Sequence, residues 1–368
     1  MLKRLYIHNF KSLQNFELDV SDLHSALFLG KNGTGKTTIF EAIEIFQKIG
    51  QGDIDVNNLF DETSFHFSNT SLPIELELDV EIDKKNYQYK LIIEFSKEFM
   101  NPRIKSEYLA IDNEKFFTRN GKNTLLKDLD DFSLNARFIY LSLISWKSIN
   151  NPLEIFKDWL KNIIILSPFP RYFNKLSKAE SSTITREAEN IIDWVRWLLS
   201  SNPSLYSIMY DFLKIRMPDL EFFKFETLGR NDRGLVFTFS EGDNSKIVNF
   251  GQLSDGEKIF FLIATVIAGQ KNNPMMLCLW DEPENFISLI EVNHFIMEFR
   301  KAFETSSTPS QLLISSHNSR VINGFSDHNI FVLTKETHLS PTRIRVLNSI
   351  EYESPTLIDA YDNGELDS

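Results

Sequence analysis

A glycine-rich turn at residues 28–38, which follows an apolar run, limits the folds open to this chain more than any other feature. Gly30, Gly35, Lys36 and Thr37 match the pattern G-x-x-x-x-G-K-[ST]. In such a loop the backbone N–H groups surround phosphate oxygens, and the start of the next helix adds partial positive charge. Glycine is needed because the backbone takes positive φ angles and approaches the ligand closely. The pattern predicts a phosphate-binding loop.

The neighbouring sequence favours the same interpretation. Residues 25–29 read as a buried strand, and apolar residues recur at helical spacing after the loop. We expect Lys36 to contact the β- and γ-phosphates of a nucleotide, and the Thr37 hydroxyl to coordinate Mg²⁺. The residues expected to bind the nucleotide here are Asn32, Gly33, Thr34, Gly35, Lys36, Thr37 and Thr38.

Composition excludes several classes of protein. The chain has 368 residues and a formal net charge of −12, which argues against a broadly basic protein that coats nucleic acid. Its longest apolar run, residues 259–268, is about half of a membrane span, so we expect no membrane segment. No signal peptide is evident, and the single cysteine, Cys278, suits a reducing compartment. These features predict a cytoplasmic protein.

The first part of the chain has the alternation of an antiparallel sheet. Short strands are expected at residues 5–8 and 16–20, and residues 74–83 and 87–95 read as a longer hairpin. Lys11 lies at the turn between the first two strands, where it could add positive charge near the phosphates, although a solvated turn lysine is equally plausible. Further strands are expected at residues 104–111, 115–119 and 138–143.

The rest of the chain changes pattern twice. Residues 151–218 carry three apolar stripes at helical spacing, and strands return near residues 222–226, 235–239 and 246–250. We therefore expect an N-terminal lobe at 1–150, a helical insertion at 151–218 and a C-terminal lobe at 219–368.

Two later segments carry polar residues of the kind that complete a nucleotide site. Ser254 and Glu257 form a capping box at the start of an apolar helix, and such a start can also present N–H groups to an anion. Asp281 and Glu282 follow a buried strand, where open α/β sheets place their ligands. We expect Asp281 to hold Mg²⁺ and Glu282 to polarise the attacking water. His317 follows another buried strand and is expected at the same edge.

In this order, the phosphate loop, the Leu-Ser-x-Gly-Glu helix start, the Asp-Glu pair and the strand-end histidine resemble the ABC-type ATPase heads of SMC, RecF and OLD proteins. The chain is most similar to short bacterial ATPases that carry Asp-Glu-Pro-Glu-Asn, here residues 281–285, and it shares Phe10-Lys11-Ser12 and Gly364-Glu365-Leu366 with them. The resemblance implies an α/β P-loop NTPase fold: an ABC-ATPase head with a mixed or parallel core sheet, an antiparallel β-subdomain and an inserted helical segment.

The resemblance also implies how the site works. ATP and Mg²⁺ would lie between two copies of the chain in a homodimer, with Ser254 and Gly256 contacting the γ-phosphate of the opposite subunit. The expected catalytic residues are Glu282, His317 and Lys36; the expected metal-binding residues are Thr37 and Asp281; Lys11 is a further candidate for nucleotide binding.

The chain departs from the family pattern at several positions. Asp255 replaces the usual second glycine of the signature, and Phe286-Ile287-Ser288 replaces a continuation that normally contains histidine. No glutamine stands clearly at the position that links the lobes, and the candidates are Gln47, Gln51 and His66. OLD nucleases append a large nuclease domain, and from the length after His317 we expect no such domain here.

The leading functional prediction is an ATPase whose nucleotide-dependent dimerisation regulates a separately encoded effector, in DNA metabolism or defence against phage. One alternative is a RecF-like repair ATPase that binds duplex DNA directly. Another is a slow ATP-binding scaffold or sensor, with Trp194 and Trp197 on its interaction surface. DNA is therefore a candidate partner, and a membrane is not.

Overall fold

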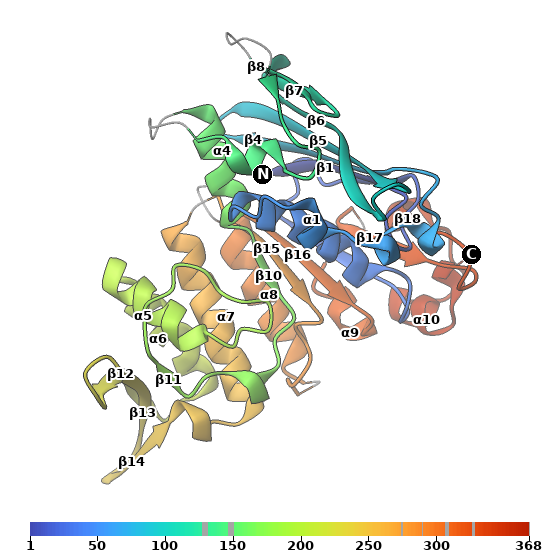
Figure 1. Ribbon diagram of the computed structural model, residues 1–368. Coiled ribbons are helices and arrows are strands. Elements are labelled where there is room, and N and C mark those ends of the chain that lie inside the picture. Colours follow the sequence, from blue (N-terminus) through green and yellow to red (C-terminus); the bar gives the residue numbers. More distant parts are fainter. Residues whose placement is uncertain are drawn as a thin grey trace. The chain divides into compact units, whose positions relative to one another are not determined.

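The computed structural model describes residues 1–126, 132–145, 151–273, 275–288, 290–305, 309–325 and 328–367 (Figure 1). The chain forms two compact units, Met1–Ile163 with Phe325–Ser368, and Ile164–Gly324. This division differs from the predicted ranges 1–150, 151–218 and 219–368. Helix α4 (Pro152–Lys161), expected to open a helical insertion, instead packs against α1 (Lys36–Gly50) in the first unit. The C-terminal residues return to the first unit because β17 (Ile330–Thr334) pairs with β3 (Ser25–Leu29).

The first unit contains an antiparallel sheet in the order β2-β1-β4-β5-β6-β7-β8-β9. The side chains of β4 (Ile74–Ile82) are alternately buried and partly exposed, as the sequence pattern predicts for a strand with one covered face. The other strands are β1 (Leu2–His8), β2 (Phe16–Asp19), β5 (Lys85–Ser96), β6 (Asn101–Ile111), β7 (Glu114–Asn120), β8 (Asn123–Leu126) and β9 (Phe132–Ser133).

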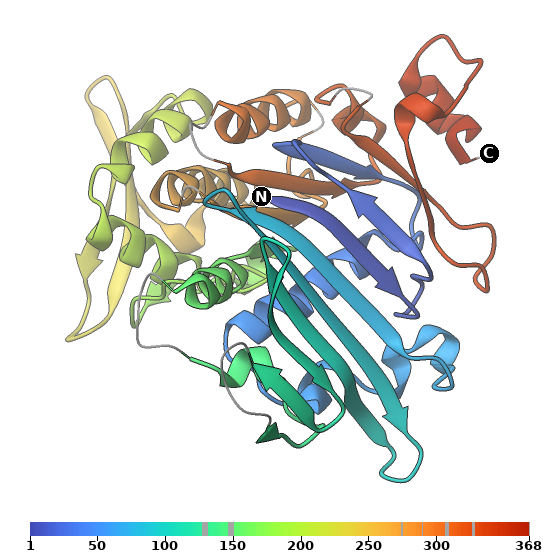
Figure 2. The same cartoon turned by 90° about the horizontal axis from the view of Figure 1, so that it is seen from above.

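Helices α1 and α4 cover one face of this sheet. Phe46 of α1 meets Tyr89 of β5 edge to face, with ring centroids 5.9 Å apart. Phe156 of α4 stacks on Tyr87 at 5.3 Å. These aromatic contacts come from the periodic apolar stripes of both helices, so the burial of one sheet face orients α1, which carries the phosphate loop at its start (Figures 1 and 2).

The prediction of a strand at residues 138–143 is wrong. Residues Tyr140–Leu143 form the short helix α3, and the buried carboxylate of Glu107 accepts the backbone N–H groups of Tyr140 and Leu141, each at 2.8 Å. Arg119, also fully buried, donates to the carbonyl oxygens of Gly121 and Asn135 at 2.8 Å. Because these buried polar groups supply partners for the backbone, the segment does not need a strand neighbour.

The first unit also contains strands β3, β17 and β18 (Arg343–Val346). Strand β17 runs parallel to β3, with Phe331 opposite Phe28, and antiparallel to β18. All five side chains of β3 are buried, which confirms the buried strand expected before the phosphate loop. Two short helices complete this unit, α2 (Val56–Leu59) and α10 (Leu357–Asp362).

The second unit contains three parallel strands in the order β10-β15-β16, with bounds Ile164–Leu166, Leu277–Asp281 and Gln311–Ser316. Strand β10 lies within the range predicted to be helical. With only three residues it has no period of its own, and pairing with β15 alone defines it. Helix α8 (Val292–Glu304) packs on this sheet through Phe299, whose ring lies 5.4 Å from that of Trp280.

A smaller antiparallel sheet and four more α-helices belong to the described part of the second unit (Figure 1). Phe261 of α7 (Asp255–Asn272) contacts Phe223, Phe237 and Phe250, which belong to this sheet and the turn after it. The other elements are β11 (Leu176–Ser177), β12 (Leu220–Thr227), β13 (Arg233–Glu241), β14 (Asn244–Asn249), α5 (Ile191–Ser201), α6 (Leu205–Arg216) and α9 (Ser319–Ile322).

Trp194 is a core residue. Its side chain is only 3% exposed, and a Cβ at Gly269 would lie 2.9 Å from its ring. The predicted interaction surface therefore cannot include Trp194, whereas Trp197 is half-buried. None of the described helices is both long enough and apolar enough to cross a bilayer.

Candidate nucleotide-binding site

The phosphate loop has the conformation that its glycines predict. Gly33 and Gly35 adopt φ angles of 81° and 99°, in the left-handed region that other residues rarely enter. A Cβ at Gly35 would also lie 2.5 Å from the Thr342 hydroxyl and 2.9 Å from that of Ser12. Two hydroxyl groups from distant parts of the first unit thus lie against this turn and leave no room for a side chain.

Lys36 is buried and is held by its own loop. Its ammonium group donates to the carbonyl oxygens of Gly30 at 2.6 Å and Lys31 at 3.1 Å. Helix α1 begins at Lys36 without a side-chain cap, so its first N–H groups face the loop. Binding of phosphate here would exchange the two carbonyl contacts of Lys36 for charge-assisted contacts to phosphate oxygens.

A pocket of about 510 Å³ opens on one side of this loop. Residues 31–34 form one wall, and residues 334–338, at the end of β17 and directly after it, form the other. This volume lies within the range typical of small-molecule sites. Asn32, Gly33 and Thr34, all predicted to bind nucleotide, therefore border a cavity, and Thr37 and Thr38 lie on the first turn of α1.

Lys11 lies beside α1 and forms an ion pair there. Its ammonium group donates to Glu41 on the helix at 2.9 Å, and its backbone takes a φ angle of 49°. A role for Lys11 in nucleotide binding stays a prediction, and it requires the ion pair with Glu41 to rearrange.

Gln47 and His66 are two of the candidates for the position that links the lobes. The side chain of Gln47 donates to the carbonyl oxygen of Ile163 at 2.5 Å, and the His66 side chain contacts the carbonyl oxygen of Lys11 at 2.5 Å.

The second unit brings together Asp281, Glu282 and His317, as the sequence predicts for residues at the ends of parallel strands. Asp281 ends β15, and the hydroxyl of Ser315, opposite it on β16, donates to its carboxylate. The backbone N–H of Glu282 donates to the carbonyl oxygen of Ser315 at 3.0 Å. Pairing of β15 with β16 therefore fixes both acidic residues relative to the histidine loop.

Glu282 has a constrained backbone and a well-defined side chain. Its φ angle is 52°, which is uncommon for a residue with a side chain and occurs mainly where the surrounding structure imposes it. The Nδ1 atom of His317 lies 2.7 Å from its Oε1 atom, and the Asn285 amide donates to Oε2 at 3.2 Å. Solvent reaches both side chains, which are 24% exposed for Glu282 and 43% for His317. A carboxylate oriented in this way can accept a hydrogen bond from a water molecule.

The residues expected to hold Mg²⁺ have suitable chemistry. Asp281 offers a carboxylate, and Thr37 a hydroxyl, which are oxygen ligands of the kind that Mg²⁺ prefers. Among the described residues, no three His, Cys, Asp or Glu side chains gather where they could hold a metal ion. Few protein ligands, completed by phosphate oxygens and water, are the usual pattern for this ion. Thr37 belongs to the first unit and Asp281 to the second.

The signature segment starts α7 with the predicted capping box. The hydroxyl of Ser254 accepts the N–H of Glu257 at 3.3 Å, and the carboxylate of Glu257 accepts the N–H of Ser254 at 2.7 Å. Asp255, the departure from the family glycine, pairs with Lys258 at 3.4 Å. A Cβ at Gly256 would lie 3.2 Å from the carbonyl oxygen of Phe286, so this glycine permits a close approach between the start of α7 and the turn after β15.

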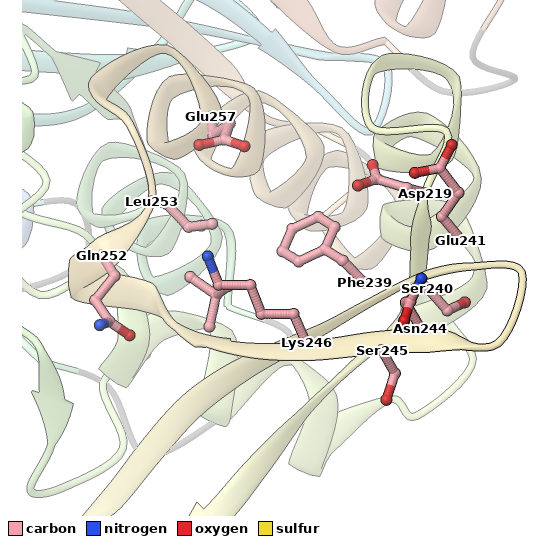
Figure 3. Close-up of a pocket in the computed structure, with 11 residues that line it drawn as sticks. Asp219, Phe239, Ser240, Glu241, Asn244, Ser245, Lys246, Gln252, Leu253 and Glu257 are labelled. Carbon is pink, nitrogen blue, oxygen red and sulfur yellow. The ribbon is translucent and has the colours of Figure 1, made fainter.

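A second pocket of about 420 Å³ lies next to this helix start (Figure 3). Leu253 and Glu257 line one side, and strands β13 and β14 supply Phe239 and Lys246 on the other. Glu257 thus borders the pocket while its carboxylate also caps α7.

Several site residues had no assigned role in the sequence analysis. Ser315, Asn285 and Ser316 contact Asp281, Glu282 and Glu284 respectively. Glu284 and Asn285 belong to the Asp-Glu-Pro-Glu-Asn motif, and this motif is the feature of the sequence that could have identified them as site residues. Nothing local marks the two serines, because their partners lie more than thirty residues away in the chain.

A P-loop at the start of α1 and acidic residues at the ends of parallel strands define the fold as a P-loop NTPase. The chain is similar to a solved SMC head bound to the C-winged-helix domain of ScpA, with 14% identity, a TM-score of 0.59 and coverage of 95% of this chain and 98% of that one. It is also similar to an SMC head with an extended coiled coil, bound to the C-terminal domain of ScpA derived from Pyrococcus furiosus. Here the identity is 14% and the TM-score 0.54, and the match covers 95% of this chain and 97% of that one. The match to the SMC head domain from Thermotoga maritima has 13% identity and a TM-score of 0.50, and it covers 94% of this chain and 98% of that one. The fold is that of an SMC-like ATPase head, which confirms the predicted class.

The family follows from the sequence match. Residues 25–323 match the family described as "AAA domain, putative AbiEii toxin, Type IV TA system". The chain belongs to this family, an ATPase family, because the match covers most of its length. A comparison with curated protein sequences finds no significant match.

Proposed function

We propose that this protein is a cytoplasmic, Mg²⁺-dependent ATPase whose nucleotide-dependent homodimerisation regulates a separately encoded effector. The observation that carries the proposal is the hydrogen bond between His317 and Glu282, the residue directly after Asp281. A phosphate loop alone would fit many nucleotide-binding proteins. An oriented carboxylate beside a histidine is what hydrolysis additionally needs.

Glu282 is the residue that we assign to the attacking water. Its Oε1 atom contacts His317 and its Oε2 atom contacts Asn285, so the carboxylate plane is fixed before substrate binds. Each carboxylate oxygen has a second lone pair, through which Glu282 can accept a hydrogen bond from water and align it. His317 is exposed beside Glu282 and would contact the γ-phosphate. Through this contact, the loss of the γ-phosphate would be linked to the position of Glu282.

The first unit would hold the nucleotide. Lys36 and the first N–H groups of α1 would bind the β- and γ-phosphates, with residues 32–35 around them. Thr37 and Asp281 would hold Mg²⁺, which bridges phosphate oxygens and neutralises developing charge when bound. Lys11 would add positive charge after leaving Glu41.

The signature segment supports the proposed dimer. Ser254 is exposed at the start of α7, and Gly256 lies within the first turn, where N–H groups without helical partners can bind an anion. In a head-to-tail dimer these residues would meet the γ-phosphate bound by the second copy and exclude bulk water. Lys258 partly neutralises Asp255, which reduces the cost of bringing this carboxylate near phosphate.

We further propose a role in DNA metabolism or anti-phage defence, and the comparisons support the part of this proposal that concerns a separate partner protein. The family description names a putative toxin of a type IV toxin–antitoxin system. Two of the similar solved structures are SMC heads bound to a domain of another protein, ScpA. A head that responds to ATP and acts through a separate protein is consistent with both.

The test is the rate of ATP hydrolysis by purified wild-type protein and by Glu282→Gln, with and without duplex DNA. We expect the variant to lose at least about a hundredfold in kcat, because the amide cannot act as a base. Equal rates would reject the assignment of Glu282 and favour a slow scaffold. Stimulation by DNA that falls steeply with salt would instead support direct DNA binding of the RecF kind.

A further inference from the structure

A second carboxylate, Glu284, lies just behind the pair of Glu282 and His317. Its side chain is 6% exposed, so it cannot meet a nucleotide or solvent directly. The hydroxyl of Ser316, which is fully buried, donates to its Oε1 atom. Its Oε2 atom is buried without a hydrogen-bond partner among the described residues. Such an arrangement is costly unless the carboxyl is neutral.

Ser316 passes this contact on to the loop that carries His317. Its hydroxyl accepts the backbone N–H of Asn318 at 2.9 Å while it donates to Glu284. His317 lies between these two residues in the chain. The chain of hydrogen bonds from Asn318 through Ser316 to Glu284 therefore ties the backbone on both sides of the histidine.

Three side-chain hydrogen bonds join the end of β15 and the turn after it to the end of β16 and His317. Asp281 is bonded to Ser315, Glu282 to His317 and Glu284 to Ser316. The first two pairs lie at the reactive end of the site, and the third is buried. Since Glu282 has a φ angle of 52°, a fixed point close behind it is needed to keep that conformation.

We propose that Glu284 is a positioning residue that, through Ser316, holds His317 against Glu282 in the orientation required for hydrolysis. This inference rests on the proposed ATPase function. Glu284 does not touch substrate; it acts as a neutral hydrogen-bond acceptor inside the protein. Burial raises the pKa of its carboxyl to about 7, and the nearby Glu282 carboxylate adds to the effect while Ser316 and His317 oppose it.

Three variants separate this role from a general loss of packing. Glu284→Gln keeps a neutral acceptor for Ser316, Glu284→Ala removes it, and Ser316→Ala removes the hydroxyl with little change in volume. With ATPase assays at pH 6, we expect kcat to fall about tenfold or more in both alanine variants, with KM for ATP changed less than about twofold. Glu284→Gln should hydrolyse ATP within about twofold of wild type.

A second measurement does not depend on hydrolysis. With ¹³C-labelled histidine, the imidazole signal of His317, assigned by its loss in His317→Asn, should move in Glu284→Ala and Ser316→Ala and stay in place in Glu284→Gln. If Glu284→Ala does not fold, Ser316→Ala and Glu284→Gln decide the question in the same two assays.

The inference would be overturned if Ser316→Ala had the kcat of wild type and an unshifted His317 signal. It would also be overturned if kcat fell as far in Glu284→Gln as in the alanine variants. The Glu282→Gln control keeps the proposals distinct. If wild type and Glu282→Gln hydrolyse ATP equally slowly, the ATPase proposal fails, and the His317 signal alone then decides whether Glu284 positions the histidine.

Discussion

Lys36 and Glu282 are each held by their surroundings before any ligand binds. The ammonium group of Lys36 contacts two carbonyl oxygens of its own loop, and Glu282 contacts His317 and Asn285. Such contacts lower the entropy lost on binding, because the side chains already occupy a narrow range of positions. The function of each residue can be tested by substituting its side chain.

Replacement of Lys36 by alanine should abolish ATP binding. The loop would lose the charge that faces the β- and γ-phosphates, and we expect a loss in affinity of at least about a hundredfold by isothermal titration calorimetry. Lys48→Ala is the matched control, since Lys48 lies at the far end of the same helix in an ion pair with Glu44. Unchanged affinity in Lys36→Ala would reject the phosphate-loop assignment.

The stability of the protein should report the pKa of Glu284. Its carboxyl is neutral in the folded protein up to about pH 7 but ionises near pH 4.5 when unfolded. The folded state thus binds more protons between these values, and stability falls as pH rises from 4.5 to 7. The difference in unfolding free energy between Glu284→Gln and wild type should grow by about 3 kcal/mol over this window and then level off. Urea denaturation at several pH values measures it, and a constant difference would contradict the raised pKa.

At the scale of elements, the start of α7 has two functions that can be separated. Ser254 caps the helix in this structure, and it is also the residue proposed to meet the γ-phosphate in a second copy of the chain. Loss of a cap costs about 1 kcal/mol, whereas loss of a contact made only in the closed dimer leaves the stability of the single chain unchanged. An aspartate is a good cap but repels phosphate.

Ser254→Asp should therefore keep the stability of wild type and lose ATP hydrolysis, while Ser254→Ala should lose about 1 kcal/mol of stability. Urea denaturation and the steady-state ATPase rate are the two measurements. A Ser254→Asp variant that hydrolyses ATP at the wild-type rate would show that this segment never meets the γ-phosphate.

At the scale of the whole molecule, the site residues divide between two compact units. The phosphate loop belongs to the first, and Asp281, Glu282, His317 and the signature segment belong to the second. In the proposed cycle, ATP shifts the balance between single chains and the dimer by its difference in affinity for these two states. Hydrolysis removes this preference and the dimer opens.

Glu282→Gln should accumulate an ATP-bound dimer, because it retains the binding residues but lacks the base. Light scattering with ATP and Mg²⁺ should give twice the mass found without nucleotide. Lys36→Ala under the same conditions is the control and should stay a monomer. Equal masses of Glu282→Gln with and without ATP would reject dimerisation as the response to the nucleotide.

The sequence by itself determined the features whose causes lie within a few residues. The glycines of the phosphate loop, the Ser254–Glu257 capping box and the alternation of β4 each follow from local backbone or periodic requirements, and the structure has all three. The fold class was also accessible, since the order of the motifs carries it.

Only the tertiary structure decided which distant residues meet. Strand β10 exists because β15 is beside it, and α3 replaces an expected strand because Glu107 accepts its N–H groups. Glu284, in the turn after β15, acquires its environment from Ser316 at the end of β16. The physical reason is that burial and hydrogen bonding between strands are set by which segments become neighbours in space, and local periodicity does not specify this.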